Sequence, residues 1–159
     1  RWPGAAGMTV QRARFDARLN ALGGRKTASA YDAIGAAQVA KASFSGMRLL
    51  HRIDGKVPIW PMDGIEPGRS AVVEIYTRIY LRRAGMSGAK LRSQADLNIA
   101  LTGLGSQPAR LAFEPDDHQT DALVTAAGMR AHASDPAAFV PQGLTPELAR
   151  TEGWTFGIV

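Results

Sequence analysis

Apolar residues recur at helical spacing along much of the chain. Between residues 9 and 22, Val10, Ala13 and Ala17 share one side of a predicted helix, and Gly23 and Gly24 follow as a C-terminal cap. A later helix begins at Asp116 or Asp117, because an aspartate there caps the free N–H groups of the first turn. In all, this spacing predicts six helices: 9–22, 29–42, 45–53, 77–84, 87–103 and 116–133.

Short apolar runs bounded by glycine or proline predict β-strands between these helices. Residues 57–60 form one such run, and the β-branched run 71–76 is stronger. Residues 145–147 have the form of a helix start with proline at the first helical position, and 154–159 closes the chain as a short strand. No repeat or low-complexity linker interrupts the pattern. We therefore expect one α/β domain over residues 1–159, built on a mostly buried sheet.

Charge is distributed unevenly along the 159 residues. Lysine and arginine exceed aspartate and glutamate by five in residues 1–30 and by four in 31–109, whereas residues 110–159 have a net charge of −4. A basic N-terminal portion beside acidic side chains suggests a surface that attracts polyanions, next to carboxylates that could hold a cation. The alternative is ordinary solvated charge.

Cysteine is absent, which excludes disulfides, thiol nucleophiles and cysteine-ligated zinc. This composition fits a reducing, cytoplasmic setting. No stretch approaches the about 20 consecutive apolar residues that span a bilayer, so no membrane partner is expected. Neither a dinucleotide-binding glycine motif, a Walker-type loop nor the glycine-flanked serine of a hydrolase occurs.

Glu74 is the first candidate for chemistry, since it lies inside the predicted strand 71–76 among valine and isoleucine. A carboxylate in a buried strand is costly unless it is paired or bound to a cation. The alternative is an edge position facing solvent, or a pairing with Arg78 or Arg82.

The second candidate is the start of the helix predicted at 116–133. Asp117, His118 and Asp121 are spaced to share one helical face there, and that face could point at Glu74. Carboxylate oxygens are the ligands that Mg²⁺ and Mn²⁺ prefer, and a pair of such ions can activate water against a phosphodiester. The alternative is that these aspartates only favour the positive end of the helix dipole.

Together these motifs resemble a family of uncharacterised proteins predicted to be RNase H-like nucleases. The resemblance rests on Val-Val-Glu-Ile-Tyr at 72–76, His-Gln-Thr-Asp-Ala-Leu at 118–123 and Glu-Gly-Trp-Thr-Phe-Gly at 152–157. It extends to residues 35–39, 46–50 and 57–61 and covers roughly residues 28 to 159. The implied fold is an RNase H-like mixed sheet flanked by helices, whose first strands would lie upstream of Arg1.

The resemblance also implies a catalytic site. It places the strand acid at Glu74 and the helix pair at His118 and Asp121, with Asp117 as a further metal ligand; the aspartate of the first strand has no counterpart in this sequence. The implied activity is a metal-dependent nuclease that uses Mg²⁺ or Mn²⁺ in a two-metal mechanism. An open sheet edge left by the missing strands would favour pairing of two copies of the chain.

Basic residues would then follow the nucleic-acid backbone. The sequence offers Arg12, Arg14, Arg18, Arg25, Lys26, Arg78 and Arg82, with Arg83, Lys90 and Arg92 beside them. Trp60, Tyr76 and Tyr80 could stack on bases, or belong to the core.

Two other functions fit the same residues. The first is a non-catalytic domain that binds nucleic acid or an acidic partner through its basic face. The second is a phosphatase or phosphotransferase, which has less support because no phosphate-cradling glycine loop is present.

Overall fold

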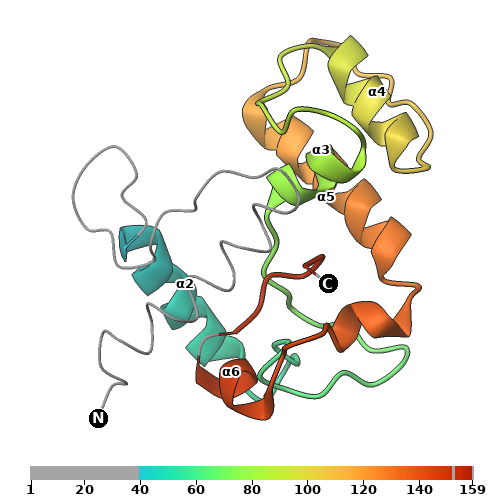
Figure 1. Ribbon diagram of the computed structural model, residues 1–159. Helices are drawn as coiled ribbons and strands as arrows, with labels where there is room; N and C mark the ends of the chain where they lie inside the picture. The colour runs from blue at the N-terminus through green and yellow to red at the C-terminus, as the bar shows by residue number, and fades with distance from the viewer. Residues whose placement is uncertain (1–39, 152, 159) are drawn as a thin grey trace. The chain divides into compact units, whose positions relative to one another are not determined.

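The computed structural model describes residues 40–151 and 153–158, and these residues form helices joined by irregular segments. Five α-helices and one 3₁₀ helix lie in the described ranges (Figure 1): α2 (Ala40–Ile53), α3 (Thr77–Arg83), α4 (Gln94–Gly103), α5 (Asp117–His132), η1 (Pro136–Phe139) and α6 (Pro146–Thr151). The helix predicted at 9–22 and most of that predicted at 29–42 lie outside these residues. None of the described helices is long and apolar enough to cross a membrane.

The prediction of an α/β fold with an RNase H-like mixed sheet is wrong for this part of the chain, which contains no β-strand. The runs 57–60 and 71–76 meet only in one isolated parallel bridge between Ile59 and Val72. Two hydrogen bonds hold it, from Trp60 N to Val72 O at 2.9 Å and from Val72 N to Pro58 O at 2.8 Å. Pro58 and Pro61 have no N–H to donate, which limits how far a ladder could extend along this run.

The predicted strand 154–159 is also absent from the part of it that the structure describes. Residues 156 and 157 form a turn instead, and Gly157 has φ of 97°, a value that suits glycine. Because no sheet forms among the described residues, the predicted pairing of copies through an open sheet edge loses its basis.

Two compact units divide the chain, one containing residues 75–144 and 155–158 and the other containing residues 40–74, 145–151 and 153–154. In the first unit, α3 and α4 both pack against α5 (Figure 1). The core between these helices and the following loops contains Tyr80, Leu81, Leu91, Leu97, Ala100, Leu101, Leu104, Val124 and Ala127. The second unit contains α2 and α6, with Trp60 and Leu148 buried.

Capping residues set the helix starts of the first unit. The Asp116 side chain accepts from Gln119 N at 2.8 Å, and the Gln119 side chain accepts from Asp116 N at 3.1 Å, so a complete capping box opens α5. The helix predicted from Asp116 or Asp117 is thereby confirmed. The helix predicted from residue 87 begins later, at Gln94, because the Ser93 hydroxyl caps it by accepting from Asp96 N. Residues 87–92 remain an irregular loop that precedes α4.

Candidate functional site

The first unit contains a run of positive charge without any acidic residue. Residues 77–93, here called the basic segment, comprise α3 and the loop that leads to α4. They include five basic side chains and no aspartate or glutamate: Arg78, Arg82, Arg83, Lys90 and Arg92. Such a segment favours an anionic partner.

Arg78 and Arg82 lie on the same face of α3, one turn apart, and the loop folds back against them. A Cβ added to Gly88 would come within 2.8 Å of Arg78 Cγ and 2.9 Å of Arg82 Nε, so the loop backbone touches both side chains. Gly88 also has φ of 74°, and this turn directs the chain toward Lys90. The loop thus lies beside the two arginines of the helix.

The described residues leave part of the hydrogen-bonding capacity of these arginines unused. Arg82 Nε is buried and has no hydrogen-bond partner among the described residues. The guanidinium of Arg78 lies over the Tyr76 ring, 5.9 Å from its centroid, in a cation–π contact. Guanidinium groups bind phosphate oxygens well because they present several N–H donors in a planar fork.

Arg83 has a structural role instead. Its guanidinium donates to the carbonyl of Gly157, and burial lowers its pKa from the ordinary arginine value. Arg83 therefore fixes the C-terminal turn to α3, and we do not include it in the candidate binding surface.

The loop end of the basic segment meets the N-terminus of α5. Lys90 forms an ion pair with Asp117, the first residue of that helix. This hydrogen bond is the main reason that the pKa of Asp117 is lowered, and the positive charges of Arg92 and His118 act in the same direction. Lys90, Arg92 and His118 therefore all lie near Asp117.

Other carboxylates near this surface are engaged by donors of the chain itself. Glu114 accepts from Gln94 N at 2.6 Å, and Asp116 caps α5. Asp96 accepts from the Ser93 hydroxyl at 2.8 Å. Each of these three acids interacts with a helix N-terminus, where the helix dipole offsets part of its charge.

The acids predicted for metal binding are divided between the two units. Asp117, His118 and Asp121 lie in the first two turns of α5, as the spacing predicted, and all three are exposed. Glu74 belongs to the other unit. Within the described residues, no group of three or more histidine, aspartate or glutamate side chains is arranged to hold a metal ion.

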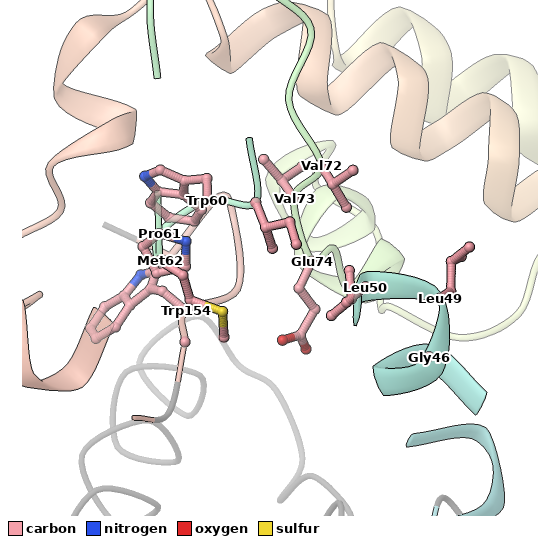
Figure 2. Close-up of a pocket in the computed structure, with 12 residues that line it drawn as sticks. Gly46, Leu49, Leu50, Trp60, Pro61, Met62, Val72, Val73, Glu74 and Trp154 are labelled. Atoms are coloured by element: carbon pink, nitrogen blue, oxygen red, sulfur yellow. The ribbon is translucent and has the colours of Figure 1, made fainter. Parts of the chain in front are cut away.

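Glu74 lines a hollow of about 240 Å³ in the second unit. Figure 2 shows its carboxylate between the side chains of Met62 and Leu50. Val72, Val73, Trp60 and Trp154 also line this hollow, so its walls are mostly apolar. Glu74 is exposed rather than enclosed in a sheet, so the expected cost of burying its charge does not arise.

The aromatic candidates from the sequence are mostly unsuited to stacking. Tyr80 is fully buried, its hydroxyl donates to Phe156 O at 3.2 Å, and burial raises its pKa to about 12. Trp60 is only 6% exposed. Tyr76 is half-buried beneath Arg78 and is the one of the three that reaches the basic surface.

The sequence reasoning overlooked Phe113, which is 86% exposed. It belongs to the loop between α4 and α5, where the sequence has neither helical nor strand periodicity. An aromatic residue in a polar loop was the available signal. The predicted contacts at Arg12, Arg14, Arg18, Arg25 and Lys26 lie outside the described residues.

Comparison of the chain with protein-family models, curated proteins and solved structures finds no match.

Proposed function

We propose that this protein binds nucleic acid through the phosphate backbone, using the basic segment. The observation that carries the proposal is the clustering of basic side chains from a segment that contains no acid of its own. Arg78 and Arg82 lie against the loop at Gly88, and Lys90 and Arg92 lie near the start of α5, where Lys90 pairs with Asp117.

Backbone binding of this kind is governed by counterion release. Each phosphate neutralised by lysine or arginine releases condensed cations, so affinity falls steeply with salt and depends little on base sequence. Four cationic side chains predict a log–log salt slope of about −3 on a single strand. The proposed ligand class is therefore a nucleic acid of any sequence.

The test is fluorescence anisotropy of a fluorescein-labelled oligothymidylate titrated with the protein at several salt concentrations. The wild-type protein should bind with the slope stated above. Replacing Lys90 and Arg92 by glutamine removes two exposed charges and should weaken binding about uniformly across sequences, with a slope about 1.5 smaller in magnitude. Adding Arg78→Gln and Arg82→Gln should remove most of the remaining affinity.

Arg48 and Arg52 provide the matched control, because they are exposed on α2 in the other unit. The double variant Arg48→Gln and Arg52→Gln removes the same amount of charge and should bind like the wild type. If the Arg48/Arg52 variant and the Lys90/Arg92 variant lose the same amount of affinity, the assignment of binding to the basic segment is overturned. Tighter binding to polyglutamate than to the oligonucleotide would instead indicate an acidic protein partner.

Cleavage of the bound strand is a separate prediction that comes from the family resemblance. It requires Mg²⁺ or Mn²⁺, and the resemblance names as metal ligands Glu74 in one unit and Asp117, His118 and Asp121 in the other. Metal-dependent cleavage lost in both Glu74→Gln and Asp121→Asn would support this prediction. If the protein binds the strand but does not cleave it at any Mn²⁺ concentration, the cleavage prediction is wrong and only the binding function remains.

A further inference from the structure

Phe113 is the most exposed large hydrophobic side chain among the described residues, at 86%. It lies in the segment between α4 and α5, and no packing role explains a phenylalanine at that position. Exposure of an aromatic ring to water is unfavourable, since burial of such a side chain is worth about 2 kcal/mol. The face of this ring is therefore accessible to a ligand.

Hydrogen bonds hold the loop on both sides of this ring. Leu111 N donates to the Gln94 side chain at 2.7 Å, and Glu114 accepts from Gln94 N at 2.6 Å. Gln94 directly follows the last residue of the basic segment. The backbone on either side of Phe113 is thus anchored where the basic segment ends, close in sequence to Arg92.

A second pair of contacts makes this loop rigid. Asn98 on α4 donates to Ala109 O at 3.2 Å and accepts from Ala109 N at 2.8 Å. Together with the bonds to Gln94, this fixes the loop along the side of α4. Phe113 is therefore presented by a supported backbone rather than by a loose one, which lowers the entropy lost when a ligand packs on the ring.

We propose that the nucleic acid bound by the basic segment is single-stranded, and that one of its bases stacks on Phe113. This inference rests on the proposed backbone binding. Single strands offer unpaired bases whose faces can stack on an aromatic ring, whereas a duplex covers those faces. Cationic side chains that follow the backbone next to such a ring are the usual combination in single-strand binding.

A protein or peptide partner fits this surface less well than a single strand does. A single ring covers far less area than the about 800 Å² per partner of a specific protein interface. The loop around Phe113 is anchored at Gln94, two residues after Arg92, and the positive charge of the basic segment favours an anionic strand over an apolar peptide.

The experiment compares the single strand with its duplex in the same anisotropy assay. We expect wild-type protein to prefer the single strand, and Phe113→Ala to weaken single-strand binding about tenfold while leaving duplex affinity and the salt slope unchanged. Phe113→Trp should restore binding, and Phe113→Leu should not. An oligomer made of abasic sites should bind wild type and Phe113→Ala equally, because it has phosphates but no bases.

Val140 provides a matched control, since it is 77% exposed in the same unit. Val140→Ala should leave single-strand affinity unchanged. Equal single-strand and duplex affinities that Phe113→Ala does not alter would overturn this inference but leave backbone binding intact. Failure of the wild-type protein to bind any of these probes would overturn both proposals.

Discussion

The ring of Tyr80 lies directly against the α-carbon of Gly128. A Cβ added to Gly128 would come within 2.9 Å of the Tyr80 Cβ and closer still to the ring. Tyr80 is on α3 and Gly128 on α5, so the missing side chain allows the two helices to pack closely. Gly157 touches the same tyrosine from the C-terminal turn, where a Cβ would lie 3.2 Å from its hydroxyl oxygen.

Gly128→Ala should therefore destabilise the protein by about 1–3 kcal/mol, although alanine is the better helix former by about 1 kcal/mol. Overpacking outweighs helix propensity because Tyr80 is fully buried and cannot move aside. Urea unfolding followed by circular dichroism measures the change. Gly46→Ala on α2 is the control, since its Cβ would meet nothing within 4 Å, and it should stabilise slightly. A neutral or stabilising Gly128→Ala would contradict the described packing.

His132, at the end of α5, should make stability depend on pH. Burial lowers its pKa below the ordinary 6.5, and the charge of Arg83 acts in the same direction, while Asp135 opposes them. The folded state therefore binds this proton less readily than the unfolded state does. The contribution of neutral His132 to the free energy of unfolding should be fully present above about pH 6.5. It should be lost progressively as the pH falls through and below that value.

The variant His132→Phe keeps a ring beside Tyr80, whose ring meets that of His132 edge-on at 6.1 Å. Between about pH 7.5 and about pH 5, the free energy of unfolding should decrease less for this variant than for the wild-type protein. The measurement is urea unfolding at a series of pH values. The same pH dependence in both proteins would show that other groups are responsible.

Asp117→Asn should increase nucleic-acid affinity. The substitution releases Lys90 from its ion pair and removes a negative charge at the edge of the basic segment. Anisotropy should show a few-fold tighter binding with a steeper salt dependence. Asp121→Asn, one turn further along α5, removes the same charge without breaking the Lys90 pair and should have a smaller effect. Weaker binding by Asp117→Asn would instead favour a role for this carboxylate as a ligand-binding group.

Asn98→Ala should destabilise the loop that carries Phe113. It removes both hydrogen bonds to Ala109, at about 1 kcal/mol each. Urea unfolding should show a loss of about 2 kcal/mol, and hydrogen exchange should be faster at Ala109. Asn98→Asp keeps the acceptor and loses the donor, so its effect on that amide should be smaller. Unchanged exchange at Ala109 would contradict the anchoring of the loop.

Helices with strong local signals could be predicted from the sequence. The capping box at Asp116 fixes the start of α5, and α3 covers Thr77–Arg83, one residue shorter than the predicted 77–84. The start of α4 was predicted seven residues too early, because an apolar pattern continues through the loop before Ser93. That loop buries Leu91 without being helical, so periodicity alone could not separate it from the helix.

The predicted strands were wrong for the same reason. An apolar run of four to six residues is equally consistent with a buried strand and with an irregular segment that lines an apolar hollow. Val72 and Val73 line such a hollow, and Ile59 pairs with Val72 in only one bridge. The assignment of Glu74 as a buried strand acid followed from the assumed sheet, whereas its exposed position agrees with the alternative of a carboxylate that faces solvent.

The sequence by itself determined the local features: the caps of α5 and α6, the glycine turn after α3, and the basic segment with no acid in it. These depend on neighbours a few residues apart, and such contacts are visible in the chain order. The tertiary structure decided which side chains interact within the protein and which stay exposed. Arg83 donates to Gly157 and Tyr80 packs against Gly128, whereas Phe113 stays exposed, because only long-range packing decides which side chains are enclosed.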